Sequence, residues 1–176
     1  MNYSLCNVKL GIGHDLNGAQ ADVKRGSKKI VTIVDDGFGS GIYDLYWHVE
    51  SEDIKKYTAE IKPFCEQLDA QDGKGYLQFV MKDQGIPEDS LWAYLFKHLL
   101  KLHEDAKNAK KMKPTANQAV WLVQEKNPSV IQRGKTYLSV GPMTETDAQV
   151  IQDFVKDGIN VDYVRRLSTK AVVEIK

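Results

Sequence analysis

The sequence contains only two cysteines, Cys6 and Cys65, among its 176 residues. They form no CxxC pair and belong to no Cys/His cluster, so the ligand spacing of a structural zinc site is missing. Such sparse cysteine is typical of proteins in a reducing compartment. Neither cysteine lies in a Cys-His motif, and we expect both to act as small hydrophobic residues rather than as nucleophiles.

The sequence also has no excess charge of either sign and no long apolar run. Lys plus Arg and Asp plus Glu number 24 each, so the overall charge does not favour a polyanionic partner. No apolar stretch approaches the roughly 18–20 residues that span a bilayer. The segment MNYSLCNVKLGIG lacks the basic and apolar regions of a secretory signal. We therefore expect a soluble cytoplasmic protein with no membrane partner.

The phosphate-binding motifs GxGxxG and GxxxxGK[ST] are absent as well. The Gly-rich segment 37–41 follows a predicted strand, but an aromatic strand rather than a helix comes after it. A phosphate cradle depends on the N-terminus of the helix behind it, so this segment is better explained as a hairpin loop. We expect no cofactor.

Residues 3–49 consist of short β-type segments separated by clusters of Gly, Asp and Asn. The β-branched run 30–34 is typical of a buried central strand, and 43–49 is predicted to be an aromatic strand. Four strands at such short spacing predict an antiparallel meander.

Residues 51–113 are predicted to be helical. Ser51 is a good N-cap, and Pro63 should kink this first helix or begin a new turn. Segment 75–82 fits a short helix or a strand. A second helix begins at Pro87 and should be central to the core, because one of its faces is a leucine stripe widened by aromatic residues. This face comprises Leu91, Trp92, Leu95, Phe96, Leu99, Leu100 and Leu102.

Residues 117–176 return to mixed structure. Two strands precede a helix that Thr144 should cap, with Asp147 completing a weak capping box. Gly158 suits the position just after this helix. The predicted strands are 119–123, 136–140 and a last strand, 171–175.

These elements predict an α+β fold with an N-terminal antiparallel β-meander packed on a central helical segment and a C-terminal β-β-α-β unit. No linker long enough to separate domains interrupts the chain, and its length fits one domain of about 100–200 residues. We expect a single domain over 1–176. It should be β-rich over 1–50, helical over 51–113 and mixed over 114–176.

Two polar clusters in the N-terminal region contain the candidate catalytic residues His14, Asp35 and Asp36. A meander would also bring other acids near them, namely Asp15, Asp22 and Asp44. Such a set suits a hard cation, which a nuclease uses to stabilise a scissile phosphate and to activate water. The same composition is ordinary in turns. We favour the structural interpretation, with no metal and no catalytic residue, and retain the metal-dependent enzyme as the alternative.

The end of the second helix is basic, and Pro114 should stop the helix there. Its candidate binding residues are Lys107, Lys110, Lys111 and Lys113. Lysines of this kind contact phosphates, but near a helix C-terminus they also offset the helix dipole as a solvated tail. A second basic cluster comprises Arg165, Arg166 and Lys170. If the lysines do not bind a partner, the aromatic strand with Tyr43, Tyr46 and Trp47 is the candidate surface for a protein–protein contact.

The segment GHDLNGAQADVKRGSKKIVTIVDDGFGSG resembles the start of small uncharacterised proteins encoded by phages and other mobile elements. In those proteins a G-[HE]-x-x-G-x-x-A turn is followed by R-x-G-K-K, an aliphatic strand and D-D-x-x-G-G. The later VWLV and RGKTYLSV are similar to their C-terminal part. The resemblance covers the two ends of the chain, and Gly39-Ser40-Gly41 departs from the usual Gly pair. It implies a mobile-element origin and intracellular action, and no known activity.

The sequence thus favours a non-enzymatic intracellular binding protein of phage or mobile-element origin. We expect it to inhibit or modulate a host defence nucleoprotein or nuclease, so that its partner is a host protein or nucleoprotein. Direct contact with nucleic acid is a secondary expectation. The alternative is a metal-dependent enzyme that acts on nucleic acid through Asp35, Asp36 and His14.

Overall fold

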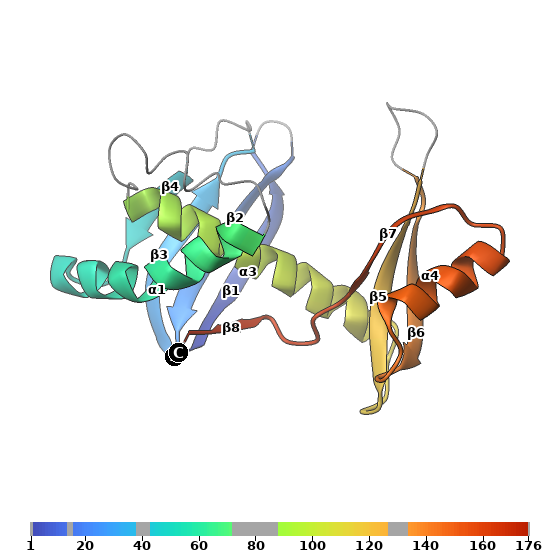
Figure 1. Ribbon diagram of the computed structural model, residues 1–176. Coiled ribbons are helices and arrows are strands. Elements are labelled where there is room, and N and C mark those ends of the chain that lie inside the picture. The colour runs from blue at the N-terminus through green and yellow to red at the C-terminus, as the bar shows by residue number, and fades with distance from the viewer. Residues whose placement is uncertain (1, 14–15, 38–42, 72–87, 127–133, 176) are drawn as a thin grey trace. The chain divides into compact units, whose positions relative to one another are not determined.

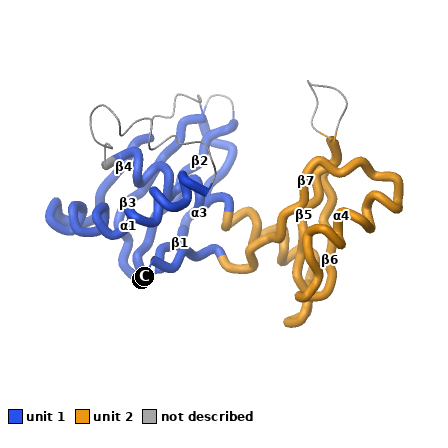
Figure 2. Tube along the Cα trace, in the orientation of Figure 1, with its two compact units in different colours: residues 1–101, 171–176 blue, residues 102–170 orange. Residues whose placement is uncertain are grey.

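The computed structural model describes residues 2–13, 16–37, 43–71, 88–126 and 134–175. The chain forms two compact units (Figure 2): unit 1 comprises residues 1–101 and 171–176, and unit 2 comprises residues 102–170. The boundary falls inside a helix rather than in a linker, and the expectation of a single domain stays a prediction. None of the described helices combines the length and the apolar character needed to cross a membrane.

Unit 1 is built on a five-stranded antiparallel sheet with the strand order β4-β3-β2-β1-β8 (Figure 1). Its strands are β1 (Asn2–Ile12), β2 (Gly18–Arg25), β3 (Lys28–Asp35), β4 (Tyr43–Trp47) and β8 (Val172–Glu174). The first four strands pair with their neighbours in the sequence, which confirms the predicted meander and the α+β class. Ile30, Val31 and Ile33 of β3 are fully buried, as expected of a β-branched strand between two others.

Two helices, α1 (Ser51–Gln71) and the first turns of α3 (Glu88–Lys111), cover one face of this sheet (Figure 1). Aromatic rings make the contact. The Trp92 ring lies 5.3 Å from that of Trp47 and 6.2 Å from that of Tyr3 between centroids, both edge-on. The Trp92 indole donates a hydrogen bond of 2.9 Å to the Thr58 hydroxyl of α1. Such pairs add about 0.5–1.5 kcal/mol each to the burial of the rings.

The predicted leucine helix is confirmed. Leu91, Leu95 and Leu99 are buried, together with the flanking aromatic residues of the same face. Cys65 of α1 is also fully buried, and burial raises the pKa of its thiol to about 12, so it behaves as a small hydrophobic residue. The predicted helix start at Pro87 and the segment 75–82 lie outside the described residues.

The start and the interior of α1 differ from the prediction. The Ile54 amide donates to the Glu50 carbonyl, which makes Ser51 the first helical residue rather than the N-cap. The helix also continues through Pro63 to Gln71, so no new turn begins there. Pro63 is exposed, and its ring therefore lies on the solvent side of the helix.

Unit 2 contains a three-stranded antiparallel sheet with the order β6-β5-β7. Its elements are β5 (Gln118–Glu125), β6 (Thr136–Pro142), α4 (Asp147–Lys156) and β7 (Val161–Arg166). Side chains alternate along β5: Trp121 packs with Val150 of α4, whereas Val120 packs with Ala109 of α3. The predicted β-β-α-β unit forms with β7 as its last strand. The expected last strand, β8, instead pairs with β1 of the other sheet.

The predicted cap of α4 is wrong by two residues. The Gln149 amide donates to the Thr146 hydroxyl, and the Gln149 side chain accepts from the Thr146 amide at 2.8 Å, which makes a reciprocal capping box. Thr144 lies in the preceding turn, which the Glu145 amide closes on the Pro142 carbonyl. Gly158 follows the helix with φ at +79°, as predicted.

Candidate functional site

The last turns of α3 present two different faces in unit 2. Asp105, Ala106 and Ala109 are buried on the side of the three-stranded sheet. The remaining positions carry exposed lysines, which we call the basic surface: Lys107, Lys110, Lys111 and Lys113. A spacing of three and four residues places Lys107, Lys110 and Lys111 on the same side of the helix.

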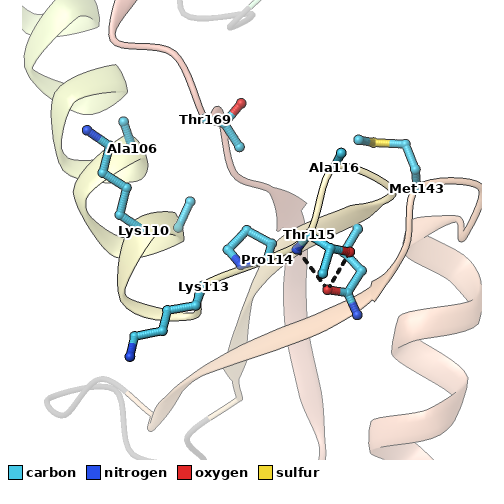
Figure 3. A pocket seen from close by; sticks show the side chains of 10 residues that line it. Ala106, Lys110, Lys113, Pro114, Thr115, Ala116, Met143 and Thr169 are labelled. Carbon is cyan, nitrogen blue, oxygen red and sulfur yellow. Dashed lines mark hydrogen bonds between the residues drawn. The ribbon is translucent and has the colours of Figure 1, made fainter.

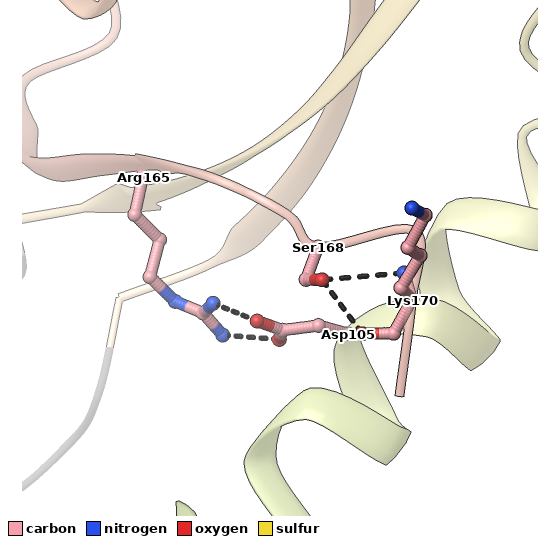
Figure 4. Close-up of polar contacts among 4 residues, drawn as sticks. All are labelled: Asp105, Arg165, Ser168 and Lys170. Atoms are coloured by element: carbon pink, nitrogen blue, oxygen red, sulfur yellow. Dashed lines mark hydrogen bonds and ion pairs between the residues drawn. The ribbon is translucent and has the colours of Figure 1, made fainter. Parts of the chain in front are cut away.

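A buried ion pair fixes this helix segment to the sheet (Figure 4). The guanidinium of Arg165 on β7 donates two hydrogen bonds to the carboxylate of Asp105, one of them 2.7 Å long. These hydrogen bonds raise the pKa of Arg165, and burial opposes them. The Asp105 side chain is 5 % exposed and that of Arg165 is 30 % exposed, so loss of Arg165 alone would leave a buried carboxylate without its counter-charge. The ion pair therefore ties α3 to the sheet two residues before Lys107, the first lysine of the basic surface.

The helix ends in a tight turn that also fixes Lys113. The amides of Met112 and Lys113 donate to the carbonyls of Ala109 and Lys110, and Lys113 has φ at +47°, before Pro114 follows. A left-handed residue at this position is a common helix stop. The predicted end of the helix before Pro114 is confirmed.

A pocket of about 420 Å³ lies beside this turn (Figure 3). Ala106, Ala109, Lys110, Lys113, Pro114, Thr115, Ala116, Gln118, Met143 and Thr169 line it. The Thr115 amide and hydroxyl both donate to the Gln118 side chain, at 2.9 and 3.0 Å, which rigidifies one wall. The pocket thus has apolar and hydroxyl-bearing walls, with two lysines on the helix side.

The lysines of the basic surface have no carboxylate partner among the described residues of the chain. Among the described residues, one side-chain hydrogen bond of these lysines is found, from the Lys111 ammonium to the Asn108 side chain at 3.3 Å. In the second predicted basic cluster, Arg165 and Arg166 make separate contacts. Arg165 is used in the ion pair, and Arg166 lies over the Trp121 ring at 5.8 Å and contacts Met143.

Asp35 and Asp36, the catalytic acids of the alternative interpretation, lie at the end of β3 in unit 1, where Asp35 is the last residue of the strand. The Asp35 carboxylate accepts the Gly37 amide at 3.0 Å, as a turn aspartate does. The backbone packs tightly here, because a Cβ added to Gly18 would lie 2.4 Å from the Asp35 carbonyl oxygen. No group of three or more His, Cys, Asp or Glu suited to a metal is present in the described part of the chain, and His14 and Asp15 fall outside that part.

The three aromatic residues proposed for β4 do not share a surface. Tyr43 packs edge-on against Phe96 of α3 at 6.2 Å, and Trp47 packs against Trp92. Tyr46 lies on the opposite face of the sheet and is 57 % exposed. Strand alternation therefore leaves Tyr46 as the accessible member of the three.

The sequence does not predict the role that Asp22 has in the structure. The sequence pattern predicts Asp22 only as a neighbour of a cation site. In the structure Asp22 is buried, and its carboxylate accepts hydrogen bonds from three side chains. These are the Thr32 hydroxyl at 2.6 Å, the Asn7 amide at 2.7 Å and the Lys29 ammonium at 2.9 Å. Burial alone would raise the pKa of Asp22, but these hydrogen bonds together lower it to about 2. Cross-strand pairing of Asp22 with Thr32 would have indicated this cluster, and the strand register is what the sequence does not give.

Comparison with protein-family models, with curated proteins and with solved structures found no match for this chain.

Proposed function

We propose that this protein is a non-enzymatic binding protein that contacts a host nucleoprotein or nuclease through the basic surface of unit 2. The observation that carries the proposal is the set of four exposed ammonium groups at the end of α3, which lack carboxylate partners among the described residues. Exposed ammonium groups without a counter-charge attract phosphates and acidic side chains.

The pocket next to the basic surface supports a partner with a protein component. Ala109, Pro114 and Met143 give it apolar walls, while Thr115 and Thr169 add hydroxyl groups. Nucleic acid alone offers little to such walls, whereas an apolar side chain flanked by acids or phosphates fits both features. The pocket and the lysines together therefore favour a nucleoprotein or an acidic protein surface.

The biological setting belongs to the same proposal. The resemblance of the N-terminal motifs to phage and mobile-element proteins supports a mobile-element origin and an intracellular location, and a host defence complex is the partner that we propose for a protein of such origin. The metal-dependent enzyme that acts through His14, Asp35 and Asp36 stays the alternative, and the hydrogen bond from the Gly37 amide to the Asp35 carboxylate supports a structural role for Asp35.

Affinity capture from host cells tests the proposal. The bait is the full chain, with and without nuclease treatment of the lysate, compared with a variant that carries Lys107→Glu, Lys110→Glu and Lys111→Glu. A matched control reverses three exposed lysines elsewhere, Lys55, Lys56 and Lys135.

We expect the basic-surface variant to lose a partner that the control variant retains. Loss of the partner after nuclease treatment identifies the nucleic-acid component as the contact, and retention identifies the protein component. Equal capture by the wild type and both variants would refute the basic surface as the binding site.

A further inference from the structure

The face of the unit 1 sheet that lies opposite α3 carries a hollow of about 520 Å³. Strand register defines this face. Asp22 pairs with Thr32, and Thr32 pairs with Tyr46, so all three lie on one side. Val23, Val31 and Trp47 alternate with them and face the helices.

Asp22 organises the floor of the hollow. Two donors, Thr32 and Lys29, bind one of its oxygens, and Asn7 binds the other. The single hydroxyl hydrogen of Thr32 goes to Asp22, so the contact of 2.8 Å between Thr32 and the Nε2 atom of His48 requires His48 to donate. The carboxylate therefore holds its donors in place and has little capacity left for a cation.

An unusual backbone conformation at Asn7 brings its side chain into this cluster. β1 is irregular between Cys6 and Lys9, and Asn7 has φ at +53°. Left-handed conformations of residues other than glycine are uncommon, and bulges re-aim side chains. Here the bulge directs the Asn7 amide onto Asp22.

The charge of the hollow favours an anion. Lys9 and Lys29 both line it, Asp22 is the one carboxylate among its described lining residues, and Gln20 adds an amide. The Lys29 side chain is 38 % exposed, so its ammonium can donate to a ligand as well as to Asp22. Tyr46 does not line the hollow itself, but it pairs across the strands with Thr32, which does, and its ring is 57 % exposed on the same face of the sheet.

We infer that this hollow binds a nucleotide unit, with its phosphate on Lys9 and Lys29 and its base stacked on Tyr46. The phosphate meets the ammonium and amide groups, and the flat base covers an aromatic ring that is otherwise exposed. This nucleotide is either a free mononucleotide or part of a single-stranded nucleic acid. The site uses residues of unit 1 only, so it is independent of the basic surface and of the proposed function.

Titration of the full chain by NMR or calorimetry tests the inference, with AMP, adenosine, inorganic phosphate and a short oligothymidylate as separate probes. We expect AMP to bind more tightly than adenosine or phosphate. An oligonucleotide that binds more tightly than AMP would identify a single strand as the source, and equal binding would identify the free nucleotide. Lys9→Ala should weaken AMP binding by about 5-fold or more, the loss expected for a charge-assisted contact.

Tyr46→Leu should remove the advantage of AMP over inorganic phosphate, since stacking contributes roughly 5- to 150-fold per base. Lys55→Ala, which removes a charge from α1, is the matched control and should leave binding unchanged. Folding of each variant is checked by its NMR spectrum, and both Lys9 and Tyr46 are exposed. Absence of AMP binding to the folded wild type, or AMP binding that neither variant changes, would overturn the inference.

Discussion

Arg165 of β7 reaches the buried carboxylate of Asp105 on α3 with both of its terminal nitrogens. Sixty residues separate the two in the sequence, so this pair fixes the last turns of α3 to a strand formed much later in the chain. The basic surface begins two residues after Asp105, at Lys107.

Removal of one member of this pair should be costly. We expect Arg165→Ala to lower the free energy of unfolding by about 3–5 kcal/mol, because Asp105 would stay buried without its counter-charge. Chemical denaturation measures the change. The double variant Asp105→Leu with Arg165→Met removes both charges and should recover much of the loss. A cost below about 1 kcal/mol for Arg165→Ala would mean that water replaces the pair.

Asp22 should make stability depend on pH in the acid range. Its pKa is about 2 in the folded protein against an ordinary value of 3.8, so folding favours the ionised form. This contribution is complete above about pH 4 and is lost as the pH falls through about 2. The shift corresponds to about 2 kcal/mol, to be measured as the difference in unfolding free energy between pH 5 and pH 2. Asp22→Asn should flatten that part of the pH profile, and an unchanged profile would contradict the role of this carboxylate.

Leu95 tests the position of α3 in the core of unit 1. It is fully buried, and Leu95→Ala should cost about 2–5 kcal/mol in a denaturant melt. Val155 of α4 is 56 % exposed and provides the control, since Val155→Ala should change stability by less than about 0.5 kcal/mol. Equal effects of the two substitutions would place Leu95 outside the core.

Gly18 tests the structural interpretation of the aspartate turn. In Gly18→Ala the new Cβ would lie 2.4 Å from the Asp35 carbonyl oxygen and 2.7 Å from that of Ile12. Both contacts are with backbone, so the strands must move apart, and we expect a loss of about 1–3 kcal/mol. Gly26→Ala meets no atom within 4 Å, but its φ of +61° imposes a smaller strain. A neutral Gly18→Ala would show that the turn is looser than described.

The basic surface should make any binding to nucleic acid depend on salt. Each phosphate contact contributes about 0.9 to the slope of log affinity against log salt concentration for a duplex. Reversal of Lys107, Lys110 and Lys111 to Glu should weaken the binding and flatten this slope, without sequence preference in either case. Fluorescence anisotropy across a salt series measures both quantities. An unchanged slope would leave these lysines as a solvated helix end.

Local patterns predicted the elements of the fold well. The β-branched run before Asp35, the leucine stripe around Leu95 and the glycine after α4 each specify a local structure through short-range rules. Of the two outcomes predicted for Pro63, a kink or a new turn, the new turn is wrong, because α1 continues through Pro63. The strand 171–175 was placed in the wrong sheet, since nothing in its few residues encodes a partner as distant as β1.

The sites were less accessible to sequence reasoning than the fold. The lysines at the end of α3 are contiguous enough to be recognised from spacing alone. The cluster of Asn7, Asp22, Lys29 and Thr32 draws its members from three strands, and only the register brings them together. Tyr43, Tyr46 and Trp47 show the same limit, because alternation separates them onto two faces although they are close in the sequence.

The pairing of β8 with β1 has a consequence for synthesis on the ribosome. Ser4 pairs with Val172, and all of unit 2 is translated between them. The outer edge of β1 therefore stays unpaired with β8 while unit 2 is translated. Unpaired strand edges recruit other strands, so during this interval the edge of β1 is open to mispairing.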